Sequence, residues 1–74
     1  MPKLPSFKPR EVVKKLIKLG FIKHHQVGSH LTMKHPITKR RAVVPVHLKD
    51  IKKGTFLSLL HEAGIDKEEF LNSR

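Results

Sequence analysis

Residues 21–34 read FIKHHQVGSHLTMK, a stretch typical of two short strands joined by a tight turn. Polar and apolar residues alternate in residues 30–34, as they do in a strand with one buried face, and residues 21–27 are expected to form the strand that precedes it. Glycine readily takes a positive φ and serine favours turns, so the chain should reverse at these two residues. We therefore expect strands at residues 21–27 and 30–34, paired antiparallel.

The second of these strands fixes the direction in which His30 points. Leu31 and Met33 are its apolar residues and should face the core. His30, Thr32 and Lys34 then point the other way, so His30 should lie on the open face of the sheet. In the first strand, strict alternation predicts one face made of Phe21, Lys23, His25 and Val27.

The pattern on either side of this hairpin predicts an α+β fold. Apolar residues at helical spacing indicate a helix from Pro9 that ends at Gly20. A third strand is expected at residues 41–46, where Pro45 marks an edge strand or the strand's end. A second helix should run from Gly54 or Thr55 to about Ala63, and a capping-box pattern at Asp66 predicts a short last helix. The expected order is αβββα with a C-terminal helical turn, in one domain spanning residues 1–74.

Composition points to a polyanionic partner. The chain of 74 residues carries a formal net charge of +10, and residues 1–61 hold fourteen Lys or Arg against two acids. Such a basic body favours nucleic acid, although a generically basic protein remains open. A membrane-surface role is less favoured, because Trp and Tyr are absent. Cysteine is absent too, residues 1–5 lack the apolar region of a secretory signal, and no membrane span is expected, so we expect a cytoplasmic protein.

Five short motifs resemble those of the HicA toxins, also called YcfA-like proteins. They are Gly28-Ser29-His30, Val44-Pro45-Val46-His47, Ile51-Lys52-Lys53-Gly54-Thr55, Ala63-Gly64-Ile65 and Glu68-Glu69-Phe70-Leu71. The resemblance implies a double-stranded-RNA-binding-domain-like fold and a toxin that cleaves mRNA independently of the ribosome. It also implies a HicB-type antitoxin that binds and blocks the toxin. By position, the family's catalytic histidine corresponds to His30.

RNA cleavage without a metal ion needs a base for the ribose 2′-hydroxyl, cations near the phosphate, and a proton for the leaving oxygen. An imidazole can accept or donate that proton near neutral pH, which makes His30 the candidate catalytic residue. Candidate RNA contacts are Gly28, Ser29, Lys23, Lys34, Arg40, Arg41, Lys52 and Lys53. A backbone role for Gly28 and a turn-forming role for Ser29 are at least as well supported, and Lys52 and Lys53 could simply be solvated.

Several alternatives stay open at this point. A non-catalytic RNA-binding module could use the same fold, whereas a DNA-binding protein is disfavoured because no helix-turn-helix pattern is present. His47 could be a second catalytic group, but a structural hydrogen bond or a cap near the second helix is the preferred interpretation. We expect no metal and no cofactor, since His24 and His25 should face opposite sides of their strand.

Overall fold

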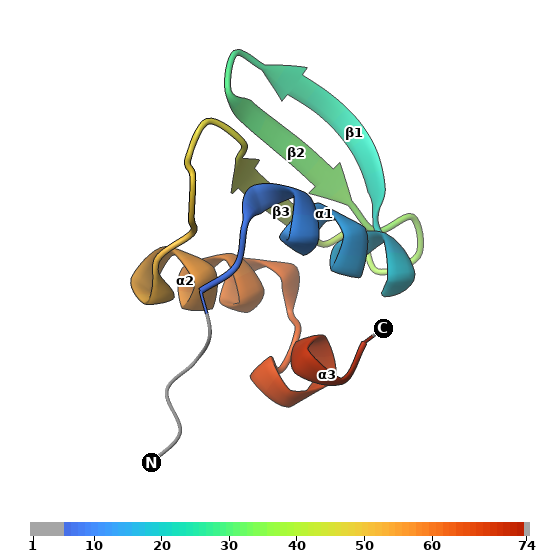
Figure 1. Cartoon of the computed structure of the whole chain (residues 1–74). Coiled ribbons are helices and arrows are strands. Elements are labelled where there is room, and N and C mark those ends of the chain that lie inside the picture. Colours follow the sequence, from blue (N-terminus) through green and yellow to red (C-terminus); the bar gives the residue numbers. More distant parts are fainter. Residues whose placement is uncertain (1–5, 74) are drawn as a thin grey trace.

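A computed structural model describes residues 6–73 and confirms the αβββα order (Figure 1). Residues 1–5, where we expect no secretory signal, and residue 74 lie outside the described part. The elements are α1 (Pro9–Lys18), β1 (Ile22–Val27), β2 (His30–Lys34), β3 (Arg41–Pro45), α2 (Lys53–Ala63) and α3 (Lys67–Asn72). The strands form one antiparallel sheet in the order β1-β2-β3. No helix within residues 6–73 is long and apolar enough to span a membrane.

The end of α1 shows why the sheet begins where it does. Gly20 has a φ of 100°, in the left-handed region, and its N–H donates to the carbonyl of Ile17. The next N–H, that of Phe21, donates to the Leu16 carbonyl at 2.9 Å, which completes a Schellman-type helix end. Phe21 is thereby held in the core rather than in β1, which starts one residue later than the alternation predicts.

One face of the paired strands β2 and β3 forms part of the hydrophobic core. Leu31 lies opposite Val44, Met33 lies opposite Ala42, and all four side chains are buried. The residues between them, including Thr32 and Val43, belong to the other face, which the helices leave open. Pro45 is the last residue of β3, at an edge of the sheet, as expected of a residue that cannot donate a ladder hydrogen bond.

The expected alternation in β1 is wrong, because a bulge interrupts the strand. Lys23 pairs with Met33 and His25 pairs with Thr32, so His24 is the extra residue. Lys23 consequently shares the inner face with Met33, whereas His25 and Val27 lie on the outer face. The bulge also brings the rings of His24 and His25 to 5.8 Å between centroids, rather than to opposite sides of the strand.

Three phenylalanines join the ends of the chain beneath the sheet. Phe7, Phe56 and Phe70 pack with ring centroids 5.1–5.4 Å apart, and burial of each stabilises the fold by roughly 1.5–3 kcal/mol. The main chain of Phe7 also accepts a hydrogen bond from the N–H of Ile51. Asp66 occupies the N-cap position of α3 as predicted, but its side chain makes no capping hydrogen bond.

Candidate active site

His30 is the first residue of β2, and its side chain is exposed on the open face of the sheet. Its partners across the sheet are Val27 on β1 and Pro45 on β3. The following residue, Leu31, turns inward and is buried, so the alternation of β2 sets the direction of His30. The expectation that this imidazole points outward is confirmed.

The turn before His30 is set by backbone geometry. Gly28 has a φ of 58°, and a Cβ added there would meet no atom within 4 Å. A positive φ at the first of two turn residues is the pattern of a type II′ hairpin turn. The Ser29 carbonyl accepts a hydrogen bond from the Val46 N–H at 2.8 Å, which ties the turn to the segment after β3.

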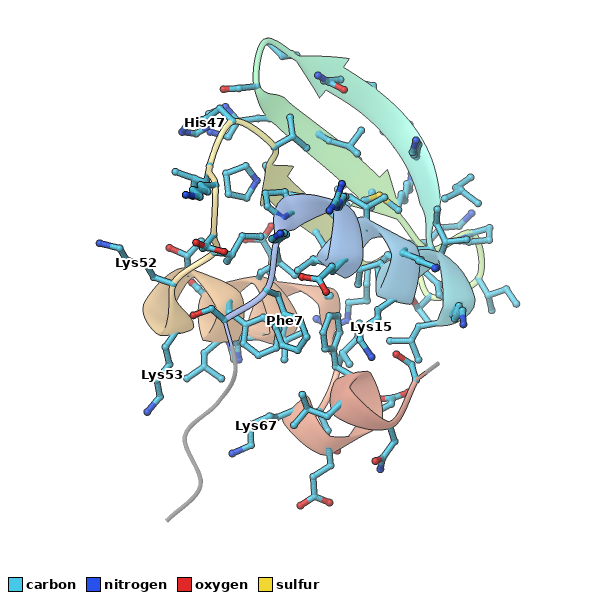
Figure 2. The ribbon with its side chains drawn as sticks, in the orientation of Figure 1. Phe7, Lys15, His47, Lys52, Lys53 and Lys67 are labelled. Carbon is cyan, nitrogen blue, oxygen red and sulfur yellow. The ribbon has the colours of Figure 1, made fainter. Side chains whose placement is uncertain are left out.

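His47 lies next to His30, two residues beyond the end of β3. The centroids of the two rings are 5.9 Å apart and their planes are inclined at 65°. Figure 2 shows His47 on the connection between β3 and α2, where that connection approaches the turn between β1 and β2. The expected cap is not found, because the N-cap of α2 is Lys52 and His47 makes no side-chain hydrogen bond within residues 6–73.

Two of the candidate cations share the face of His30. Lys34 ends β2 and lies opposite Arg41, the first residue of β3. Both belong to the same alternation as His30 and therefore project from the outer face. Lys34 is four residue steps along β2 from His30, which corresponds to roughly 13 Å along the sheet. Lys34 and Arg41 therefore lie on the face of His30 but at the opposite end of β2.

The other candidate cations lie elsewhere. Lys23 is on the inner face and lines a groove with Arg10 and Lys14 of α1. Lys52 and Lys53 project from the start of α2 (Figure 2). The guanidinium of Arg40 packs over Gly64 at the end of α2, with Nε 3.1 Å from the position of a Cβ on that glycine. The structure therefore does not gather the six cations around His30.

Residues 9–65 match the family described as the HicA toxin of bacterial toxin–antitoxin systems. The chain belongs to the HicA toxin family. The match spans most of the 74 residues and includes His30, His47 and every candidate cation, but ends before α3. No curated protein matches the chain.

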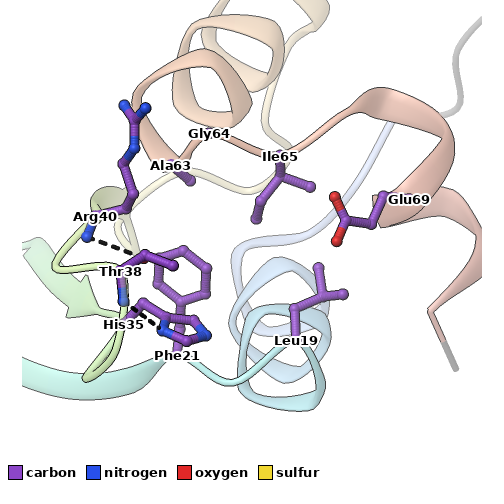
Figure 3. Close-up of a pocket in the computed structure, with 9 residues that line it drawn as sticks. All are labelled: Leu19, Phe21, His35, Thr38, Arg40, Ala63, Gly64, Ile65 and Glu69. Atoms are coloured by element: carbon purple, nitrogen blue, oxygen red, sulfur yellow. Dashed lines mark hydrogen bonds between the residues drawn. The ribbon is translucent and has the colours of Figure 1, made fainter.

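In this HicA-family chain a cavity of about 170 Å³ lies beside the connection between β2 and β3 (Figure 3). Nδ1 of His35 accepts hydrogen bonds there from the N–H groups of Ile37 and Thr38. The His35 ring also packs edge-on against Phe21 at 5.3 Å. His35 thus stabilises the connection and takes no part in the His30 site.

Sequence reasoning undervalued the position of His47 in this HicA toxin. A signal was present, because antiparallel pairing puts the end of the third strand beside the start of the second. The motif ending in His47 therefore had to lie near His30.

Within residues 6–73, no three His, Asp or Glu side chains are grouped closely enough to hold a metal ion.

Proposed function

We propose that this HicA-family chain is an endoribonuclease toxin that cleaves mRNA without a metal ion and independently of the ribosome, with His30 as a catalytic residue. Membership of a toxin family supports the biological role. The exposed imidazole at the start of β2 carries the chemical part of the proposal, because it is open to a ribose-phosphate linkage.

The chemistry follows from what an RNA chain offers at such a site. In its neutral form the imidazole of His30 accepts the proton of a ribose 2′-hydroxyl, and the resulting oxyanion attacks the adjacent phosphorus. Lys34 and Arg41 on the same face bind further phosphates and hold the strand in place. Gly28 and Ser29 let the RNA strand approach the turn between β1 and β2. Lys52 and Lys53 bind phosphates at the start of α2.

The antitoxin partner is proposed to be of the HicB type and to cover the open face of the sheet. That face carries exposed apolar side chains along its length, namely Val27 opposite His30 (67% exposed), Val43 opposite Thr32 (40%) and Ile22 opposite Lys34 (53%). Apolar surface next to cations is typical of an interface that another protein covers. Substitution of Val43 by Asp should therefore weaken antitoxin binding measured by calorimetry, whereas the same change at exposed Leu57 of α2 should not.

The central experiment incubates the purified protein with end-labelled RNA in the presence of a chelator. The parent should cut the RNA, and His30→Gln should lose roughly 10²–10⁴-fold in rate while keeping its circular dichroism spectrum. His61→Gln is the matched control, because this imidazole is also exposed but lies on the last turn of α2. Equal cutting by His30→Gln and the parent would contradict the assignment.

A non-catalytic RNA-binding module is the rival function, and one observation favours it. The candidate cations are spread over several elements rather than gathered at His30. Binding of RNA by both the parent and His30→Gln, with no cutting by either, would support this module and contradict the enzyme.

A further inference from the structure

The imidazoles of His30 and His47 lie side by side, although the two residues are distant in the sequence. His30 begins β2, and His47 follows the end of the antiparallel neighbour β3, so the two rings lie at the same end of the sheet, and both are exposed to solvent. A centroid separation of 5.9 Å leaves them close enough for one phosphodiester linkage to touch both.

Backbone hydrogen bonds hold this pair together. His30 is directly opposite Pro45 in the register of β2 with β3. One residue further on, the Val46 N–H donates to the Ser29 carbonyl at 2.8 Å, and the Leu48 N–H donates back to the Pro45 carbonyl at 3.3 Å. The second bond folds the chain into a turn that returns the side chain of His47 toward β2. The approach of the two rings therefore does not depend on flexible side chains alone.

Within residues 6–73, neither imidazole makes a side-chain hydrogen bond that stabilises the fold. His30 and His47 make no side-chain hydrogen bond there, whereas His35 accepts two backbone N–H groups and packs on Phe21. Nitrogens without partners remain available for a substrate. An exposed imidazole also gives the core little stability, because His47 buries no apolar surface comparable to that of the phenylalanines.

We propose that His47 is the second proton-transfer group, the general acid that complements His30 as general base; this inference rests on the ribonuclease function proposed above. His30 takes the proton of the 2′-hydroxyl, and the 2′-oxygen forms a bond to phosphorus. The bond from phosphorus to the 5′-oxygen breaks, and that oxygen takes a proton from His47. The products are a 2′,3′-cyclic phosphate and a 5′-hydroxyl. One proton enters His30 and one leaves His47, so no metal ion or further reactant is required.

A substrate with an altered leaving group tests the role of His47. The linkage that the parent cuts is made with sulfur in place of the bridging 5′-oxygen, so that the leaving group is a thiolate. A thiol is far more acidic than an alcohol, and its anion leaves without protonation. On ordinary RNA, His47→Gln should be slower than the parent by roughly 10²–10⁴-fold. On the sulfur-containing substrate it should regain a rate within about tenfold of the parent's, because the missing acid is no longer needed.

The sulfur substrate also separates this role from misfolding and from a failure of the proposed function. A misfolded variant would cut neither substrate, so recovery of activity on the sulfur-containing substrate shows that the variant is folded. His30→Gln should be slow on both, since the base is still needed, and His61→Gln should match the parent on both. Parent-like cutting of ordinary RNA by His47→Gln would overturn the acid role while leaving the ribonuclease function intact. So would failure on both substrates by a His47→Gln protein that keeps the parent's circular dichroism spectrum and urea midpoint. Failure of the parent itself to cut RNA would overturn the proposed function instead.

Discussion

At the scale of single residues, Gly20 tolerates substitution least among the glycines that end or join elements. Its φ of 100° is strained for any residue with a Cβ. A Cβ there would also lie 2.6 Å from Nε2 of His35. That ring cannot move cheaply, because it packs on Phe21 and accepts two backbone hydrogen bonds.

Gly20→Ala should therefore lower the free energy of unfolding by roughly 2–4 kcal/mol, which combines the backbone strain with the overlap at His35. Gly28→Ala is the matched control, since Gly28 also has a positive φ but open space around it. It should cost only about 1–2 kcal/mol. Urea unfolding followed by circular dichroism measures the free energy of unfolding of both variants. Equal decreases would show that the overlap with His35 does not affect stability.

At the scale of elements, α3 contacts the rest of the fold through the buried ring of Phe70, partly buried Leu71, and Lys15 of α1. Phe70 is fully buried between Phe7 and Phe56. Nζ of Lys15 donates to the Ser73 carbonyl at 2.6 Å and lies 5.7 Å from the centroid of Phe70. A helix of six residues is not stable in water by itself, so these contacts hold α3 in place.

Phe70→Ala should destabilise the protein by roughly 3–5 kcal/mol, through lost burial and the cavity left behind. For 74 residues the total stability is on the order of 4–11 kcal/mol, so this variant can lose most of it. Phe70→Leu keeps much of the volume and should retain a cooperative transition at a lower urea midpoint. A change below about 1 kcal/mol for Phe70→Ala would mean that α3 contributes little to the core.

The strand β1 differs from its neighbours because all six of its side chains are exposed. It is an edge strand that pairs only with β2, whereas β2 and β3 each place two residues in the core. Local opening of β1 should therefore need less free energy than opening of the central strand.

Amide hydrogen exchange measured by NMR should show this difference. The amides of β1 should exchange at least about tenfold faster than those of the buried residues Met33 and Val44. Equal protection across the sheet would indicate that the hairpin opens only when the whole protein unfolds.

At the scale of the whole molecule, charge is unevenly divided along the chain. Residues 1–61 carry a net charge of +12, from fourteen Lys or Arg and two acids, whereas residues 62–74 carry −2, from two Lys or Arg and four acids. The acidic segment contains α3, so the basic part of the surface belongs to the sheet, α1 and the start of α2. A polyanion should bind to that part.

RNA binding should consequently weaken with salt, and each phosphate contact should contribute about 0.7 to the slope of log affinity against log salt concentration. Lys53→Gln, at the start of α2, should reduce the slope by about 0.7. Lys67→Gln is the control, because this exposed lysine lies in α3 beside Glu68 and Glu69 and should leave the slope unchanged. Measurements by fluorescence anisotropy at several salt concentrations give both values, and identical slopes for Lys53→Gln and the parent would remove Lys53 from the binding surface.

The sequence was a good guide where two or more signals agreed. Helix ends were predictable because Gly20 and Gly64 follow clear apolar periodicity. The direction of His30 was predictable because Leu31 and Met33, which alternate with it, are both apolar. The face of Lys23 was not predictable, because a bulge depends on how two strands meet and leaves no mark in one strand's alternation.

Local sequence by itself determined the order of the elements, the site of the hairpin turn and the outward display of His30. These follow from backbone preferences and from the need to bury apolar side chains, which act over a few residues. Only the tertiary structure decided that His47 lies beside His30, that Arg40 packs over Gly64, and that the candidate cations do not converge. Such placements depend on strand register and helix packing between residues far apart in the chain, which no short-range pattern fixes.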